Sequence, residues 1–459
     1  MRVLDLGVIS NNERFRRRAE LVARFFDFEF RLFKNDEDFF SNSGDYKGIS
    51  CVVLDCSELT KPNEVAGQVQ VAKQAAPESY ILTVVSSKLS PEDARIVKTS
   101  GASLVIMENE YFSSSKPEFI LSQVIRSTYF PIKALDLVQG TEVSFPIFHL
   151  LSVNKRFLKI AKPGYKVGKD FLEKYADVGD LYLQRSDLPA WVQYTNLHST
   201  EGAESHLRKC RLRFLQLNQS FLNLILLITD QSSAASFAQG RELFEICEGF
   251  AADLLDSMAD LPDPWSVISN SAIGDFGSVE RAPAIAAYAG ILSSQARMGN
   301  PKEVMIGALL ADVGFLDLSP STTEKVRQNR LNDLNAEEKM EYQKHPIYSL
   351  NQCLSRKLPL SEDIKEIIIQ SHERMDQRGF PHHVRSDKLN EAGMLVRLCW
   401  DLDMRCQVRM GEKRVDIKEV KQKLSESATN DTGNYSFIFL NKILKLLNKP
   451  ENNGEVIVV

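Results

Sequence analysis

The chain contains few histidines and few cysteines. Its 459 residues include seven histidines and seven cysteines, and no histidine occurs between positions 207 and 344. The cysteines form no CxxC pair, and neighbours such as Cys51 and Cys56 lie in or beside apolar segments. An odd number of cysteines in apolar surroundings predicts buried, reduced thiols and a reducing compartment.

Long apolar runs and a strong net charge are also absent. The longest helical apolar stretch, FLNLILLI, is far shorter than the roughly 20 residues that span a bilayer. The first residues, MRVLDLGVISNNERFRRR, predict a strand and a basic helix start without the apolar core of a signal peptide. A net charge of −5 argues against wrapping by nucleic acid. We therefore expect a cytoplasmic protein with no membrane span and no nucleic-acid partner.

The composition is globular, and apolar patterning divides the chain. Residues 1–130 alternate apolar runs with amphipathic segments such as NERFRRRAELVARFF and SPEDARIVKTSG. The apolar runs lie at 3–9, 49–56, 80–87 and 102–107. This alternation predicts an α/β domain with a parallel sheet that is covered on both faces.

The remaining chain changes character twice. Residues 131–202 contain EVSFPIFHLLS, RFLKIAKPGYKV and DLYLQRSDLPAWVQY, which predict strands and a small β-rich domain. Residues 203–262 predict a helical connector that is apolar on more than one face, so it is buried either within the chain or in a homodimer interface. An all-α domain is expected at 263–450, followed by a tail at 451–459.

Three segments of the first domain resemble response-regulator receiver domains, which have a flavodoxin-like fold. VVLDCS resembles the phosphoacceptor strand, GASLVIMEN resembles the segment that carries the family's lysine, and Thr83 matches the switch hydroxyl. The resemblance implies that Asp55 is the phosphoacceptor. However, Ser10-Asn11 replaces the acidic pair that holds Mg²⁺, and Glu108 replaces the lysine. Because an aspartyl phosphate needs both cations, we expect an unphosphorylated pseudo-receiver.

Four segments of the last domain occur in the order of the HD-GYP motifs. They are GALLADVGF, KHPIYSL, SHERMDQRGFP and LVRLCWDLDM. The chain from 270 onward therefore resembles the HD-GYP phosphodiesterases, metal-dependent helical enzymes of the HD superfamily that hydrolyse cyclic di-GMP. The resemblance implies an HD-superfamily helical fold, and it allows each motif position to be compared with the family pattern.

The comparison indicates a degenerate site. The retained positions are Asp312, His345, His372 and, if the 382–391 loop shifts the register by one, Asp401. The lost ligand positions are Ser278, Ala311, Ser371 and Trp400, and Phe315 replaces the catalytic lysine. Hydrolysis by bridged metal ions needs a dense ring of histidines and carboxylates. We therefore expect a pseudoenzyme with no cofactor, or at most one Fe- or Mn-type ion at the vestigial site. If no ion binds, we expect the retained residues to have structural roles.

The turn after His372 keeps the glycine and proline of the GYP motif. Its residues are Asp376, Arg378, Gly379, Phe380 and Pro381. Gly and Pro fix a turn, which is a structural reason for their presence. The resemblance implies a second role, because this loop in the family is implicated in docking partner proteins, notably diguanylate cyclase domains. His382 and His383 follow the turn and are expected to be solvated, although they also suggest a metal pair.

Both candidate sites lack residues that their chemistry requires, while the apolar patterns of both folds persist. We therefore predict a bacterial, catalytically inactive scaffold or adaptor in cyclic-di-GMP or two-component signalling. Its expected partners are proteins, such as a diguanylate cyclase domain or a histidine kinase system. Two alternatives stay open: a sensor that binds cyclic di-GMP without hydrolysis, and a residual metal-dependent phosphodiesterase.

Overall fold

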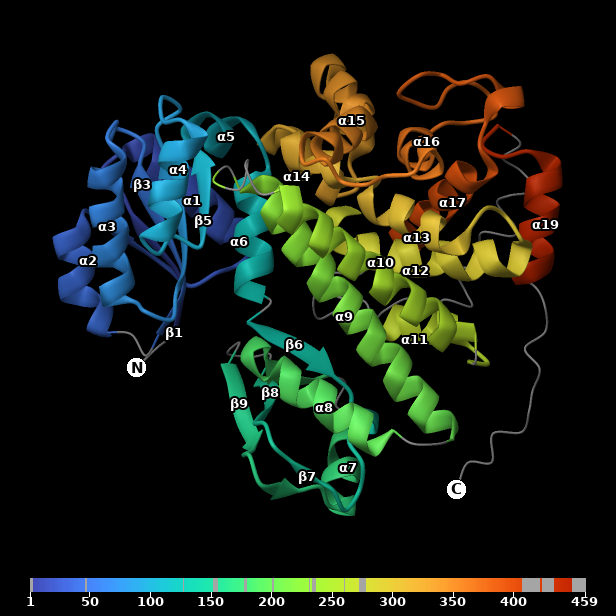
Figure 1. Ribbon diagram of the computed structural model, residues 1–459, viewed down its shortest axis with the longest axis horizontal. Helices are drawn as coiled ribbons and strands as arrows, with labels where there is room; N and C mark the ends of the chain where they lie inside the picture. Colours follow the sequence, from blue (N-terminus) through green and yellow to red (C-terminus); the bar gives the residue numbers. More distant parts are fainter. Residues whose placement is uncertain are drawn as a thin grey trace.

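The computed structural model shows a parallel sheet at one end, a small β-rich part, and a group of helices at the other end (Figure 1). It describes residues 3–45, 48–126, 128–151, 156–176, 180–199, 202–230, 232, 237–259, 261–271, 278–406, 422 and 433–447. Among these residues, no helix is both long enough and apolar enough to cross a membrane.

The N-terminal sheet has five parallel strands in the order β2-β1-β3-β4-β5. They are β1 (Val3–Ile9), β2 (Phe30–Phe33), β3 (Gly48–Cys56), β4 (Tyr80–Val85) and β5 (Leu104–Met107). Around them lie α1 (Glu13–Phe25), α2 (Asp36–Asn42), α3 (Pro62–Ala75), α4 (Pro91–Thr99), α5 (Glu108–Ser113) and α6 (Lys116–Arg126). The order is one of the two common orders of doubly wound sheets.

The expected parallel sheet is confirmed, but the sequence did not reveal β2. This strand is short and lies at the edge of the sheet, and three of its four residues are only half-buried. Its sequence, FRLF, is interrupted by Arg31 and therefore lacks the continuous apolar run of the other four strands. In contrast, Val52, Val53 and Leu54 of β3 are fully buried, because helices cover both faces there.

The β-rich part contains a four-stranded antiparallel sheet in the order β6-β11-β8-β9 and a short β10-β7 pair. Its strands are β6 (Tyr129–Ile132), β7 (Glu142–Val143), β8 (Ile147–Leu151), β9 (Arg156–Ala161), β10 (Tyr165–Lys166) and β11 (Leu181–Gln184). Two helices belong to this part: α7 (Lys169–Ala176), between β10 and β11, and α8 (Leu188–His198), after β11. The strand expected over LPAWVQY is wrong, since this segment forms α8: Pro189 lies in its first turn, and Trp191, Tyr194 and Thr195 bury one helical face.

The rest of the described chain is helical. The helices are α9 (Ala203–Thr229), α10 (Phe237–Ala259), α11 (Pro264–Ser271), α12 (Ser278–Ala296), α13 (Pro301–Leu310), α14 (Pro320–Arg327), α15 (Ala336–Ser355), α16 (Glu362–Gln370), α17 (Glu391–Cys406) and α19 (Phe437–Leu447). A 3₁₀-helix, η5 (Val313–Asp317), follows α13. Helix α9 packs along α10, and its Phe214, Leu217 and Ile225 are buried in the same core as α12 and α13. The apolar surface of the connector is thus covered within the chain, and the homodimer stays a prediction.

The N-terminal unit, which consists of the parallel sheet and its helices, contacts the C-terminal helices through the turn between α5 and α6. The backbone N–H of Ser115 donates to the carbonyl of Leu316 (3.1 Å), and its hydroxyl donates to the carbonyl of Leu318 (2.8 Å). The next residue, Lys116, forms an ion pair with Asp317 (3.3 Å). These bonds hold η5, and η5 begins directly after Asp312.

Candidate functional site

Asp312, His345 and His372 meet between three helices. Asp312 lies between α13 and η5, His345 lies in α15, and His372 follows α16. A glycine permits this close packing, because a Cβ at position 314 would lie 2.1 Å from the carbonyl oxygen of His345. The Gly314 N–H also donates to the Ser349 hydroxyl (2.7 Å), which fixes η5 against α15.

The three side chains form a compact, buried cluster. The Nε2 atoms of His345 and His372 each lie 3.1 Å from Oδ1 of Asp312. All three residues are at most 3% exposed. Their ligand atoms lie within 4.8 Å of one another. Among the described residues, these three form the group of histidines, cysteines and carboxylates that is close enough to hold a metal ion. The structure thus brings together three of the four retained positions.

The surroundings of His345 restrict its protonation. Its Nδ1 lies 2.6 Å from the carbonyl oxygen of Tyr342, which only accepts hydrogen bonds, so Nδ1 carries a proton. Nε2 then faces the Asp312 carboxylate, another acceptor. Two states satisfy both contacts: an imidazolium paired with Asp312, or a neutral ring whose Nε2 shares one cation with Asp312. A ring that donates from Nδ1 to a carbonyl is the usual arrangement of a metal-binding histidine.

The charges of the other two residues suit either state. Burial opposes ionisation of Asp312, but the hydrogen bonds and charges of His345 and His372 hold the pKa of its carboxyl well below the usual value. Burial lowers the pKa of His372 to about 4, although its bond to Asp312 acts in the opposite direction. Asp312 is therefore ionised and His372 is neutral near pH 7, as metal binding requires.

Aromatic rings pack on both histidines of the cluster. Phe315 stacks on His345, with ring centroids 4.2 Å apart and planes inclined by 20°. Phe380 stacks on His372 at 5.0 Å and 8°. Trp400 meets His372 edge-on at 5.4 Å. These rings supply no carboxylate or imidazole, and they fill space beside both histidines.

The structure places Trp400, rather than Asp401, beside the cluster. Asp401 instead accepts a hydrogen bond from the Tyr435 hydroxyl (2.7 Å). Asp403, two residues further along α17, is fully buried and accepts from Arg281 (2.9 Å). Both carboxylates therefore have structural partners outside the cluster.

The residues present fit one ion and do not fit a bridged cluster. Ala311 and Ser371 offer no imidazole, and Ser371 donates its hydroxyl to the Ile368 carbonyl (2.9 Å). The expectation for Ser278 concerns a side chain outside the described part of the chain, although the residue begins α12. Asp312, His345 and His372 would supply three ligands to a single Fe- or Mn-type ion, which would act as a Lewis acid when bound.

The turn after His372 has an inward and an outward side. Gly379 is required there, because a Cβ would lie 2.4 Å from the backbone nitrogen of Arg374. A hydrogen bond from Arg374 lowers the pKa of Asp376 to about 2, and Phe380 points inward onto His372. Arg378 is exposed. Any docking surface on this turn therefore consists of Arg378 and its exposed neighbours.

His382 and His383 lie just beyond this turn and are both exposed. They belong to no metal-capable group among the described residues. The buried Glu373 instead fixes this segment, because its carboxylate accepts from the backbone N–H groups of His382 (2.7 Å) and Val384 (3.1 Å).

The residues predicted from the receiver resemblance lie in β3 and β4 and at the start of α5. Asp55 accepts hydrogen bonds from the Ser10 hydroxyl (2.6 Å) and the Ser57 hydroxyl (2.7 Å). Thr83 is fully buried, and its hydroxyl has no hydrogen-bond partner among the described residues. Glu108 begins α5, directly after β5. A serine hydroxyl thus contacts Asp55 where the family pattern has an acidic pair.

One buried ion pair at α12 has no recognisable signal in the sequence. Glu280 forms an ion pair with Arg327 (2.5 Å), and both side chains are at most 8% exposed. No motif marked either residue, and 47 positions separate them. Their pairing depends on how α14 packs against α12, which local sequence patterns do not encode.

The HD domain family matches residues 258–432, so the C-terminal helices contain an HD domain. Among solved structures, the chain is similar to "Bd1817, a HDG"Y"P protein from Bdellovibrio bacteriovorus". The identity is 14% and the TM-score is 0.44, over 70% of this chain and 100% of that chain. A comparison with curated proteins finds no match.

Proposed function

We propose that this protein is a non-hydrolysing HD-domain protein that acts as a scaffold or adaptor in cyclic-di-GMP or two-component signalling. One observation carries the proposal. Phe315 and Trp400 pack on the two histidines of the cluster at the positions where hydrolysis would need a lysine and a carboxylate. A phosphodiester would need this space and these charges, because a metal-assisted reaction must hold the phosphate and activate a water.

Binding, rather than chemistry, also accounts for the N-terminal domain. The strand order agrees with a flavodoxin-like receiver fold. Ser10 donates to Asp55 where an acidic pair would bind Mg²⁺. A receiver-like domain without that cation retains surfaces for protein partners. The same reasoning favours a protein partner for the C-terminal domain, with Arg378 at the exposed side of its turn.

Metal content and hydrolysis test the catalytic part of the proposal together. Protein purified without oxygen is analysed for Fe and Mn and then assayed for cyclic-di-GMP hydrolysis beside an active HD-GYP enzyme. We expect at most one ion per chain and no turnover. Two or more ions per chain with turnover that Asp312→Ala abolishes would show that the protein is a phosphodiesterase.

A binding assay tests the adaptor role. The full chain is titrated with a purified diguanylate cyclase domain and, separately, with cyclic di-GMP. The proposal expects binding of the protein domain, at least tenfold weaker in Arg378→Glu and unchanged in Arg241→Glu, a charge reversal on the exposed surface of α10. Saturable binding of cyclic di-GMP alone would favour the sensor instead.

A further inference from the structure

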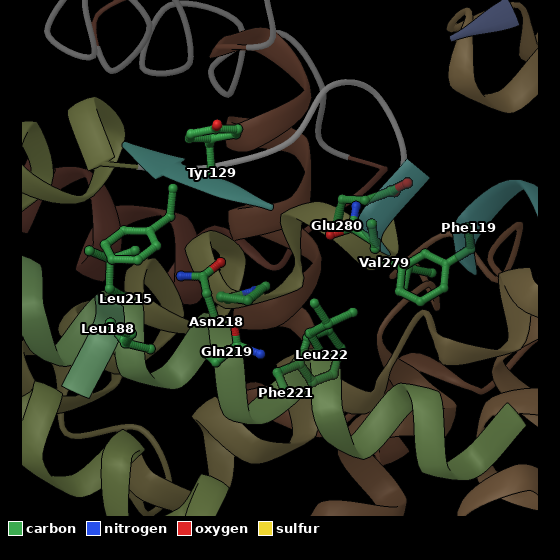
Figure 2. Close-up of a pocket in the computed structure, with 13 residues that line it drawn as sticks. Phe119, Tyr129, Leu188, Leu215, Asn218, Gln219, Phe221, Leu222, Val279 and Glu280 are labelled. Atoms are coloured by element: carbon green, nitrogen blue, oxygen red, sulfur yellow. The ribbon is translucent and has the colours of Figure 1, made fainter. Parts of the chain in front are cut away.

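The apolar side chains of the connector face other elements of the same chain. Figure 2 shows Leu215, Phe221 and Leu222 of α9 in the wall of a pocket that Phe119 of α6 and Val279 of α12 also line. These side chains therefore pack within one chain. A candidate surface for a second copy of the chain lies instead on α15, at the outer edge of the C-terminal helices (Figure 1).

Helix α15 has a buried face, which includes His345 of the cluster, and an opposite face that is open to solvent. Residues at alternating steps of four and three lie on one side of a helix, and here they form a stripe: Met340, Lys344, Ile347, Asn351 and Leu354. Met340 is 52% exposed and Leu354 is 45% exposed, while Ile347 between them is half-buried. The stripe is about 21 Å long at 1.5 Å per residue. It thus offers apolar side chains at both ends and in the middle.

This stripe is complementary to itself. Two antiparallel copies of α15 related by a two-fold axis at Ile347 bring together residues that lie equally far before and after Ile347 in the sequence. Met340 then faces the partner subunit's Leu354, so an apolar side chain meets an apolar side chain. Gln343 faces the partner subunit's Asn351, and two amides can exchange hydrogen bonds. Each of these pairs occurs twice in the dimer.

The charged residues favour the antiparallel orientation. Glu337 lies in the first turn of α15, and Lys357 follows its last turn. Both are exposed, although the Lys357 ammonium also lies over the Phe237 ring, 4.1 Å from its centroid. In the antiparallel pair Glu337 faces the partner subunit's Lys357, and Lys344 packs its aliphatic stem beside the partner subunit's Leu350. A parallel pair would instead place Glu337 beside Glu337 and Lys344 beside Lys344, and like charges repel.

We infer that two copies of the chain associate through α15 as an antiparallel, two-fold pair. Such an interface uses the same surface on both subunits, so it closes at two copies. One helix pair is smaller than a standard interface of roughly 800 Å² per partner, so we expect a reversible dimer with a dissociation constant in the micromolar range. Because the Asp312 cluster faces the other side of α15, dimerisation depends neither on metal binding nor on the proposed adaptor role.

Sedimentation equilibrium of the full-length protein over a range of concentrations tests the dimer. The mass should rise from 51.8 kDa towards twice that value. Ile347→Glu places two carboxylates at the two-fold axis and should weaken the dimer at least tenfold, whereas Leu21→Glu, at a 66% exposed position of α1, should leave it unchanged. Circular dichroism checks folding, and Leu354→Glu replaces Ile347→Glu if that variant does not fold. An original chain that is monomeric at every concentration, or a dimer that a folded α15 variant does not weaken, would overturn the inference.

Exchanged charges test the orientation of the two helices. Met340→Glu and Leu354→Lys should each weaken the dimer, because each buries an unpaired charge against an apolar side chain. The two positions lie about 21 Å apart in one helix, so the new charges cannot pair within a chain. In the double variant each new carboxylate meets the partner's new ammonium only if the helices are antiparallel, so we expect dimerisation to recover. A double variant that dimerises no better than either single variant would contradict the antiparallel pair.

Discussion

Replacing Asp312 by alanine tests whether the buried cluster stabilises the HD domain. The change removes the oxygen that faces both His345 and His372 at 3.1 Å. A hydrogen bond to a charged group contributes about 1.5–3 kcal/mol, and breaking a buried charged pair costs about 3–5 kcal/mol. Since the His345 ring then faces no acceptor at Nε2, we expect Asp312→Ala to lower the free energy of unfolding by about 3–5 kcal/mol.

Urea unfolding with a metal chelator present measures this loss. Trp400 lies 5.4 Å from His372, so part of the fluorescence of the three tryptophans reports on the neighbourhood of the cluster. The control is Asp387→Ala, whose carboxylate is 57% exposed and pairs with Arg385 at the surface. Exposed pairs contribute about 0–1 kcal/mol, so the control should unfold almost like the original chain. A loss below about 1 kcal/mol in Asp312→Ala would refute the structural role of the cluster.

The same variant distinguishes the two states of His345. Mn²⁺ that binds only the folded chain raises its stability with concentration. If the cluster shares one cation, Mn²⁺ stabilises the original chain and leaves Asp312→Ala unchanged. If His345 is an imidazolium paired with Asp312, Mn²⁺ has no effect on either protein, and the cluster is held by hydrogen bonds alone.

Three further results are expected in metal-free protein. The pKa of His372 is lowered to about 4, so between pH 6.5 and 4 the unfolded chain binds a proton that the folded chain does not. As the pH is lowered through this window, the free energy of unfolding should decrease by about 3 kcal/mol, at 1.36 kcal/mol per pKa unit. Urea unfolding at each pH should show a smaller decrease in His372→Gln and the same decrease in His382→Gln. Gly314→Ala places a Cβ 2.1 Å from a backbone oxygen of α15 and should cost about 1–3 kcal/mol or more in urea unfolding. Arg281→Ala leaves the fully buried Asp403 without this cation and should cost about 3–5 kcal/mol, with a lower midpoint of thermal unfolding; a change under 1 kcal/mol would contradict the buried pairing.

The parts of the fold that the sequence predicts are those encoded by local periodicity. The central strands are continuous apolar runs, so four of the five parallel strands are apparent from the amino-acid sequence alone. Strand β2 is not, because it has only four residues, three of which are half-buried, and Arg31 interrupts its apolar run. The helix α8 escapes prediction for a different reason. Its apolar residues, including Trp191 and Tyr194, also fit a strand when the segment is considered alone.

The candidate site also contains residues that the sequence identifies and residues that only the packed structure places. Motif order identifies Asp312, His345 and His372, because each lies at a fixed place within its own motif. The choice between Trp400 and Asp401 depends on how α17 is rotated against α16, and only the packed structure places Trp400 on His372. The Glu280–Arg327 pair is likewise a product of helix packing. Local patterns thus predict the members of a site more readily than its boundaries.

If the protein does not hydrolyse cyclic di-GMP, as proposed, the packing would still explain why Asp312, His345 and His372 stay together. Asp312 is fixed by two histidines, and η5, which follows it, is held by Ser115 of the N-terminal unit and by Ser349 of α15. Removing any member of this cluster would leave a buried polar group without its partner, which is costly regardless of catalysis. In contrast, Phe315 and Trp400 bury apolar surface where a lysine and a carboxylate would need compensation. The stability of the assembled fold is therefore a sufficient reason for Asp312, His345 and His372 to stay together in the proposed non-hydrolysing protein.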